Sequence, residues 1–238
     1  MPFARQTGGR PMLYDISPPI SERLQVWPGD NPPRREVLLD LARGDNITLS
    51  TLHATVHLGS HADAPSHFGR TARTIDEQDL ETYLGPCQVV RVEARPHERI
   101  ASVPIALETP RVLIATGTFP DPEHFNEDFA ALAPELIGRL HAQGVRLVGI
   151  DTPSVDLFDS RDLPTHRACL EHDLAILEGL RLKHVPAGMY ELIALPLKLV
   201  GFDASPVRAV LRPLAGRVSQ YNEIAGSRGS ASGQENIA

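Results

Sequence analysis

Three histidines and one aspartate fall within one short segment, HLGSHADAPSH, which runs from residue 57 to residue 67. The four side chains all occupy odd positions: His57, His61, Asp63 and His67. Alternate residues of an extended chain point to the same side, so the segment presents one polar face. Imidazole nitrogens and a carboxylate oxygen suit zinc or manganese better than calcium. Each histidine taken alone is more often structural, but the shared spacing of the set predicts a metal site.

The backbone of this segment must bend if its first two histidines are to share one ion. Residues four apart on a straight strand are separated by about 13 Å, whereas two nitrogens on one zinc ion lie within roughly 3.5 Å of each other. Gly59 stands between the two histidines and tolerates the dihedral angles of a bulge. We therefore expect a strand that ends in a bend at Gly59, then a turn at residues 64–65 that returns His67 to the site. His53 precedes the bend and is interpreted as structural.

A second stretch, PTHRACLEHDLAILEGL at 164–180, offers further ligands. Its candidates are His166, His172, Asp173 and Glu178, and spacing alone does not choose among them. His172 and Asp173 could as easily lie on a solvated face. Glu178 follows the apolar run Ala-Ile-Leu, where a buried unpaired carboxylate is costly. Either a metal or an exposed strand edge would explain it.

The composition is ordinary for a folded soluble protein. The chain has 238 residues and a formal net charge of −7, which argues against nucleic-acid and anionic-membrane partners. No apolar run approaches the ~18 residues that indicate a membrane span. Cys87 and Cys169 lie far apart and form no CxxC pair, so we expect no disulfide framework and a cytoplasmic location.

The elements expected around these residues are mostly strands. Segments rich in β-branched residues predict strands at 37–41, 47–58, 87–94, 111–118, 145–151 and 190–200. A proline first turn, an apolar stripe and a following glycine predict a helix over 134–143. This helix would join the strands at 111–118 and 145–151 in a βαβ-type unit. A second helix is expected from about Pro164.

The predicted fold class is mixed α/β, a single domain with a large curved or barrel-like mixed sheet flanked by a few helices. We expect this domain to span residues 12–215. Residues 1–11 are predicted to be a loose segment, and the Gly/Ser-rich residues 216–238 a disordered tail.

The segment HLGSHADAPSHF resembles the HxGxHxDxPxHF signature of the metal-dependent cyclase and hydrolase family. The flanking stretches DISPPISERLQVWPGD, VRLVGIDTPSVD, HDLAILEGL and ELIALPLKLVGFDASPVRAVLR are similar to its bacterial kynurenine formamidase (arylformamidase) branch. The likeness covers nearly all of residues 13–212. One departure is Ser60, where the family commonly has threonine, a change that retains the hydroxyl.

The resemblance implies two divalent metal ions, Zn²⁺ first and Mn²⁺ as the alternative. The residues that match metal ligands are His57, His61, Asp63, His166 and Glu178, with Asp63 and Glu178 touching both ions. His67 matches the catalytic acid/base. Trp27 matches a residue that lines the substrate pocket, although a lone tryptophan could equally be packing. Asp151 follows a predicted strand and could support the site from behind or simply begin a turn.

The function that the resemblance implies is hydrolysis of N-formyl-L-kynurenine to L-kynurenine and formate by a metal-activated hydroxide, in a homodimer. One alternative is another amide or lactone hydrolase of the same family. A non-catalytic metal-binding protein is a second, and it would need neither His67 nor an open coordination position. The chain has no GxGxxG or GxSxG sequence to support an enzyme of a dinucleotide or serine-hydrolase type.

Overall fold

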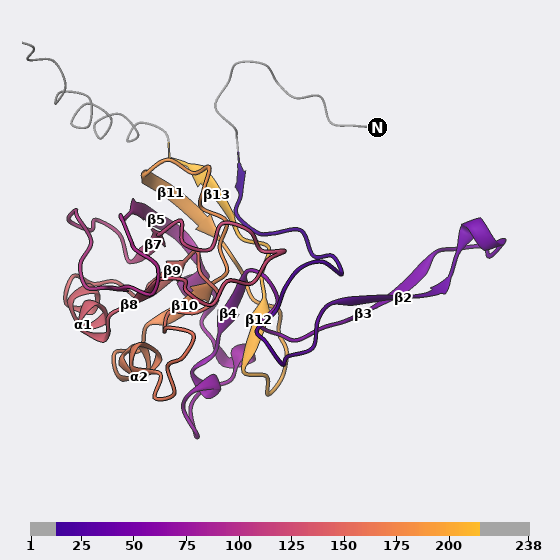
Figure 1. The fold of residues 1–238 in the computed structure, drawn as a ribbon, viewed down its shortest axis with the longest axis horizontal. Coiled ribbons are helices and arrows are strands. Elements are labelled where there is room, and N and C mark those ends of the chain that lie inside the picture. The colour runs from indigo at the N-terminus through magenta and orange to yellow at the C-terminus, as the bar shows by residue number, and fades with distance from the viewer. Residues whose placement is uncertain (1–12, 215–238) are drawn as a thin grey trace, which may run out of the picture.

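A nine-stranded mixed sheet organises the computed structural model, which describes residues 13–214 (Figure 1). Its strand order is β1-β13-β11-β5-β7-β9-β10-β4-β12. Strands β5, β7, β9 and β10 are parallel to one another, and the other strand pairs of this sheet are antiparallel. The predicted mixed α/β architecture is therefore confirmed. The strands are β1 (Tyr14–Asp15), β4 (His61–Asp63), β5 (Leu84–Arg91), β7 (Arg111–Ala115), β9 (Leu147–Ile150), β10 (Ala175–Glu178), β11 (Gly188–Ile193), β12 (Ala204–Pro206) and β13 (Val210–Pro213).

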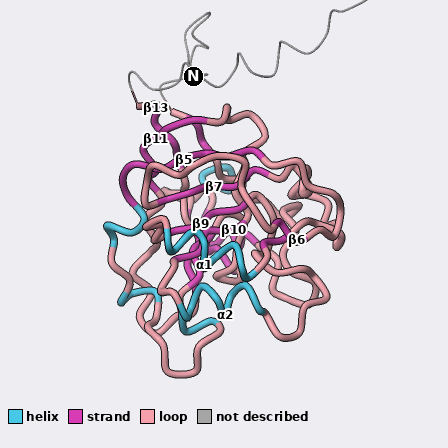
Figure 2. The backbone as a smooth tube through the Cα atoms, turned by 90° about the vertical axis from the view of Figure 1, so that its left-hand side faces the viewer, coloured by secondary structure: helices cyan, strands magenta, loops and turns pink. Residues whose placement is uncertain are grey.

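Apolar side chains cover both faces of this sheet. In β7, Leu113 and Ala115 enter one buried cluster, whereas Val112 and Ile114 enter the other. This alternation follows from the two-residue period of a strand. The second cluster also contains residues of α1 (Pro134–Ala142), and Figure 2 shows α1 and α2 (Pro164–Glu171) on the same side of the sheet. The two helices thus close one face.

The βαβ-type unit predicted from the sequence is present. Strands β7 and β9 pair in parallel, and α1 lies between them in the chain. Helix α1 begins at Pro134, as predicted, and ends one residue earlier than expected, before Gly144 with φ +83°. Helix α2 begins at Pro164, also as predicted. No helix of the described part of the chain is long and apolar enough to cross a membrane.

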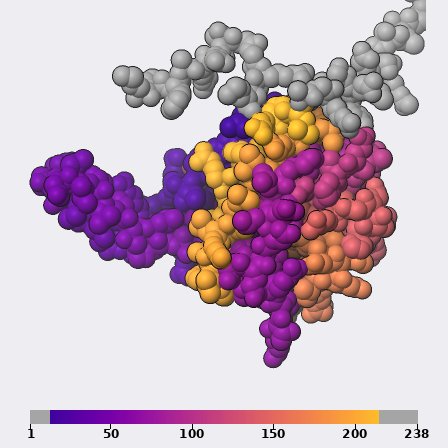
Figure 3. All heavy atoms as spheres, turned by 180° about the vertical axis from the view of Figure 1, so that it is seen from behind, coloured from indigo at the N-terminus to yellow at the C-terminus, as the bar shows by residue number. Residues whose placement is uncertain are grey.

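A two-stranded arm projects from the body of the molecule (Figures 1 and 3). It consists of β2 (Arg34–Leu39) and β3 (Leu49–His53), which pair with each other and with no other described strand. The predicted strand over 47–58 was wrong in its extent, because β3 ends at His53. The residues after it leave the arm and turn into the body, so they cannot continue the same strand.

Several shorter elements were not predicted. Strands β6 (Arg99–Ile100) and β8 (Ala131–Leu132) pair in parallel, and 3₁₀ helices occupy Leu41–Arg43, Pro65–His67, Ile75–Glu77 and Leu80–Tyr83. The strand expected over 190–200 ends at Ile193. Strands β4, β10, β12 and β13 have three or four residues each, too few to show a period in the sequence. The predicted loose segment 1–11 and tail 216–238 lie outside the described residues.

Two glycines allow the segment before β4 to lie against the end of β10. Gly59 has φ +58° and Gly179 has φ +65°. A Cβ atom on Gly179 would lie 2.2 Å from the carbonyl oxygen of Gly59, well inside contact distance. The backbone bend that carries His57 and His61 is therefore held directly against the residue that follows Glu178.

Replacing Gly179 by alanine tests this close approach. We expect Gly179→Ala to lower the free energy of unfolding by about 3 kcal/mol, from the positive φ and the backbone clash together. Gly144→Ala is the matched control, because Gly144 also has positive φ but nothing within 4 Å of its added Cβ. The control substitution should lower the free energy of unfolding by about 1 kcal/mol. Equal losses for the two variants in urea unfolding would show that the contact is unimportant.

Candidate metal centre

Neighbouring strands place two of the candidate ligands side by side. Strand β4 lies between β10 and β12, and its register sets His61 directly opposite Glu178. Paired residues of antiparallel strands point to the same face. The next pair on this face is Asp63 and Ile176, and Ile176 belongs to the apolar cluster under the helices. His61, Asp63 and Glu178 therefore face α2.

The bend at Gly59 adds a second histidine to this group. The ring centroids of His57 and His61 are 5.0 Å apart, although the two residues are four apart in the chain. Nδ1 of His57 lies 3.1 Å from Oδ1 of Asp63, and Nε2 of His61 lies 3.5 Å from the same oxygen. Nε2 of His61 also lies 3.3 Å from Oε2 of Glu178.

The first turn of α2 contributes His166 from the facing layer. Its Nε2 lies 3.4 Å from Oδ2 of Asp63 and 3.5 Å from Oε1 of Glu178. Asp156 holds this turn in place, because its carboxylate accepts the backbone N–H groups of Thr165 and His166 and the Nδ1 proton of His166 at 2.8 Å. One carboxylate thus caps the helix and orients the imidazole.

Each of the three imidazoles has one nitrogen held by an oxygen and the other directed at the buried carboxylates. Nδ1 of His61 donates to the carbonyl of Gly59 at 3.0 Å, as Nδ1 of His166 donates to Asp156. Nε2 of His57 contacts Oδ2 of Asp203 at 3.0 Å. In an unprotonated imidazole, a nitrogen that donates to an oxygen fixes the tautomer, so the other nitrogen has the lone pair that a metal would take.

Three inner atoms of the centre have no hydrogen-bond partner among the described residues. Nε2 of His61 and both carboxylate oxygens of Asp63 are buried and unpaired, although imidazole nitrogens lie within 3.5 Å of them. Buried polar atoms are normally satisfied. Donor atoms that converge without bonding to one another fit a shared cation. Two sets of ligand atoms that lie within 4.8 Å of one another, one with His57 and His61 and one with His67 and His166, have Asp63 in common.

The ionisable groups of the centre shift one another's pKa values. Burial alone would lower the pKa of His57, but the carboxylates of Asp63 and Asp203 raise it to about 9. Burial would also lower the pKa of His166, but the carboxylates of Asp156 and Asp63 raise it well above its usual value. Burial would raise the pKa of Asp63, but His166 and His57 hold it well below its usual value. The carboxylates are therefore ionised at neutral pH.

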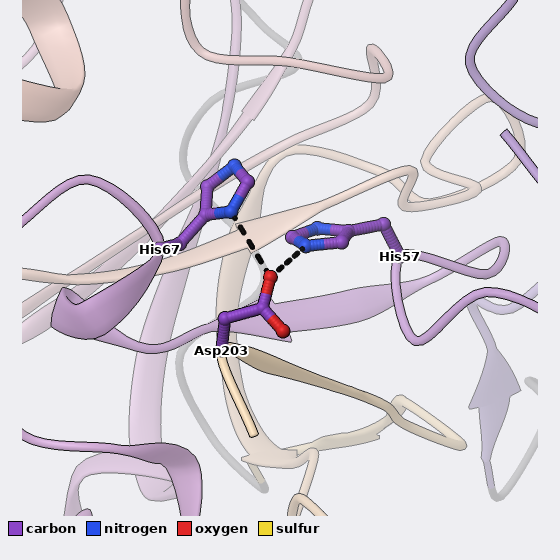
Figure 4. Close-up of side chains that lie close together, drawn as sticks. All are labelled: His57, His67 and Asp203. Atoms are coloured by element: carbon purple, nitrogen blue, oxygen red, sulfur yellow. Dashed lines mark hydrogen bonds and ion pairs between the residues drawn. The ribbon is translucent and has the colours of Figure 1, made fainter. Parts of the chain in front are cut away.

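His67 lies at the edge of this group, on the 3₁₀ helix Pro65–His67. Figure 4 shows His57 and His67 directed at one carboxylate oxygen of Asp203. The distance from Nδ1 of His67 to Oδ2 of Asp203 is 3.3 Å, and the rings of the two histidines are 4.3 Å apart. The His67 side chain keeps 33% of its surface exposed, so it can meet a bound molecule.

An aromatic cavity of about 620 Å³ opens onto the centre. That volume suits a drug-sized molecule. The predicted pocket residue Trp27 lines it and contacts Phe125 and Phe158, whose ring centroids lie 5.7 Å and 5.0 Å from that of the indole. His57, His61, His67, His166 and Glu178 also line the cavity.

All the sequence-predicted ligands therefore lie together, and the remaining candidates lie elsewhere. His172 stacks on His141, with ring centroids 4.8 Å apart, and Asp173 forms an ion pair with Arg73. His53, interpreted as structural, lies on the arm, 2.6 Å from Glu36. Asp151, left open in the sequence, accepts hydrogen bonds from the backbone of residues 116 and 117 and lines the cavity.

Sequence reasoning missed two carboxylates of the centre, Asp156 and Asp203. Both stand in the stretches that carry the family resemblance, VRLVGIDTPSVD and VGFDASP. Neither has a spacing that links it to the histidine it contacts, since Asp203 is 136 residues from His67. The only available signal was their place within those stretches.

Comparison with known proteins identifies the class to which this architecture belongs. The family model described as putative cyclase matches residues 14–157, more than half of the sequence, and the chain belongs to this family. A solved structure of a potential metal-dependent hydrolase with cyclase activity superposes with a TM-score of 0.71 at 29% identity, covering 84% of this chain and 96% of its own. A predicted metal-dependent hydrolase from Bacillus stearothermophilus gives 0.68 at 29% identity, with 84% and 97% covered.

One characterised relative is more similar in sequence. A kynurenine formamidase of Bordetella pertussis is 45% identical over 207 residues, which make up 85% of this chain and 99% of that protein. The resemblance found in the sequence, including its branch, is thereby confirmed.

The raised pKa values predict how metal binding should depend on pH. His57 and His166 hold protons at pH 7 in the metal-free protein, whereas a ligand imidazole must be unprotonated. We expect Zn²⁺ binding at pH 7 to release on the order of one to two protons, and affinity to rise with pH up to about 9. Calorimetry in two buffers of different ionisation enthalpy measures this release. Equal heats in both buffers at pH 7 would contradict the charge states described above.

Proposed function

We propose that the chain is a metal-dependent arylformamidase that hydrolyses N-formyl-L-kynurenine to L-kynurenine and formate. The observation that carries the proposal is that each of His57, His61 and His166 has one ring nitrogen held by an oxygen and the other turned to Asp63 and Glu178, at the wall of an aromatic cavity. The 45% identity to the kynurenine formamidase of Bordetella pertussis supports this substrate.

The donor set supports two divalent ions, with zinc as the first expectation and manganese as the second. Asp63 belongs to both sets of converging ligand atoms, and Glu178 presents one oxygen toward His61 and the other toward His166. Asp63 and Glu178 would hold such ions together with His57, His61 and His166. When bound, such ions lower the pKa of a water molecule and polarise the formyl carbonyl group.

His67 is placed to move the proton that the reaction requires. Water loses a proton when it attacks the formyl carbon, and the aniline nitrogen gains one when the C–N bond breaks. With Nδ1 of His67 donating to Asp203, Nε2 is the atom that takes and then delivers this proton. Asp203 is a positioning residue, since it contacts the imidazole and does not line the cavity.

Trp27 and its aromatic neighbours provide the wall for the aryl ring. The indole contacts Phe125 and Phe158, which also line the cavity, with ring centroids 5.7 Å and 5.0 Å from its own. Such a wall binds a flat ring by burial and edge contacts. The formamide group, which is attached to that ring, then points to the histidines on the same cavity wall.

The proposed activity is tested with the purified protein and N-formyl-L-kynurenine, before and after chelation, by following the absorbance of the released arylamine. We expect release that stops on chelation and returns with Zn²⁺ or Mn²⁺. His67→Ala should keep its metal but lose about 10²–10⁴-fold in kcat. The control is His184→Ala, at an exposed histidine outside the cavity lining, which should leave the rate unchanged.

Other outcomes of this experiment discriminate between the alternatives. Hydrolysis of other amides or of lactones, with N-formyl-L-kynurenine left intact, would indicate a different hydrolase of the same family. Bound metal with no hydrolysis of any of them would indicate a metal-binding protein. Full activity in metal-loaded His67→Ala would remove His67 from its assigned role.

The arm supports a further proposal, that the protein is a homodimer. A two-stranded hairpin is marginally stable by itself, and neither of the two buried clusters includes a residue of β2 or β3. Five large apolar side chains of the arm and of the connection between its two strands are nevertheless exposed: Leu38, Leu41, Ile47, Leu49 and Leu52. A second copy that packs on this arm would bury them in a closed two-fold assembly. We also propose a cytoplasmic location, which the unpaired buried Cys87 and Cys169 support.

Charged substitutions on the arm test the dimer. We expect the double variant Leu41→Asp, Leu52→Asp to halve the molar mass measured by light scattering, because a carboxylate is costly to bury in an apolar contact. Leu170→Asp is the control, since Leu170 is also exposed but lies on α2. A double variant that keeps the mass of the unmodified protein, or an unmodified protein that is already monomeric, would exclude this interface.

A further inference from the structure

Two loops whose aromatic residues contact each other at the cavity wall each carry a charged residue three positions after the aromatic one. The rings of Trp27 and Phe158 contact each other, with centroids 5.0 Å apart and planes 32° apart. Asp30 follows Trp27, and Arg161 follows Phe158. Both charged residues line the cavity. The aromatic contact therefore brings together two loops that carry a carboxylate and a guanidinium at the same cavity.

Tight turns hold both charged residues at fixed positions relative to the rings. The backbone N–H of Asp30 bonds to the carbonyl of Trp27 at 2.9 Å, and Gly29 has φ +94°, which makes 27–30 a turn with proline and glycine at its centre. A turn from Leu157 to Ser160 precedes Arg161. The backbone at both charged residues is thus positioned before any ligand arrives.

Neither charge is neutralised within the described chain. Arg161 forms no hydrogen bond or ion pair with a described residue, and the Asp30 side chain accepts one hydrogen bond, from the backbone N–H of Asn31 at 2.7 Å. Asp30 and Arg161 also form no ion pair with each other within residues 13–214. Opposite charges that share a cavity without pairing leave room for a ligand that carries both signs.

The other charged groups at the same wall are already occupied. Arg181 donates to the carbonyl oxygens of Phe119 and Pro120, at 3.2 Å and 2.8 Å. Asp151 accepts from the backbone of Thr116 and Gly117 and from the Thr116 hydroxyl. Their hydrogen bonds shape the cavity wall, so among the charged lining residues outside the metal centre Asp30 and Arg161 are the ones left for a ligand.

We propose that Arg161 binds the α-carboxylate and Asp30 the α-ammonium group of an amino-acid substrate. The proposal rests on the arylformamidase function above and explains how the enzyme selects the charged end of its substrate. The formamide faces the histidines, the ring lies along the aromatic wall, and the zwitterionic end reaches the two loops. Contacts at the ring, the carboxylate and the ammonium group together also distinguish the L from the D enantiomer.

The test compares two substrates that differ only at the charged end. N-formyl-L-kynurenine carries the amino-acid group, whereas 2-formamidoacetophenone keeps the ring, ketone and formamide without it. We expect Arg161→Gln and Asp30→Asn each to lower kcat/KM for N-formyl-L-kynurenine about 10-fold more than for the neutral compound, mainly through KM. The matched controls are Arg70→Gln and Asp162→Asn, at exposed residues outside the cavity lining, which should show no such difference.

The result that would overturn the proposal is an equal effect on both substrates, or no effect on either. If the unmodified protein cleaves neither compound, the arylformamidase function is instead overturned. In that case the subsite is decided by binding of L-kynurenine, measured by quenching of Trp27, the only tryptophan of the chain. Binding weakened about 10-fold in Arg161→Gln would support the subsite, and unchanged binding would exclude it.

Discussion

The burial of two carboxylates on adjacent strands is the constraint on which this structure depends. Asp63 and Glu178 lie on one face of β4 and β10, where each is at least 97% buried. Like charges so close together, away from water, are costly unless cations compensate them. The surrounding histidines supply that compensation only when protonated, and a protonated imidazole cannot bind metal. The two buried carboxylates need positive charge, so the occupant that stabilises them is a cation.

The metal ligands and the wall of the substrate cavity lie on different parts of the fold. Three ligands lie on the short strands β4 and β10, His166 lies on the capped first turn of α2, and His57 lies on the bend before β4. The cavity wall comes from loops, at residues 24–30 and 151–163. Strands and helices hold ligand atoms to a fraction of an ångström, and loops tolerate change. Members of one family could thus keep a metal centre while they recognise different substrates.

The sequence predicted the chemistry of this protein better than its topology. The histidine motif required a bend, and Gly59 provides it, because spacing along one segment is a local property. The βαβ-type unit followed from periodicity. In contrast, β4 and β10 are too short to show a pattern, and their pairing joins residues 61 and 178. Asp156 and Asp203 were missed for the same reason, since their partners become neighbours only after the chain has folded.

The position of β4 has a consequence for the order in which the molecule can be made. This strand hydrogen-bonds to β10 on one side and to β12 on the other, so its neighbours are residues 175–178 and 204–206. A nascent chain leaves the ribosome from its N-terminus, so the histidine segment emerges long before either neighbour has been synthesised. Until then its carboxylate and imidazoles remain in water. Assembly of the centre is thus one of the last events of biosynthesis, and a chain truncated before residue 204 lacks one wall of it.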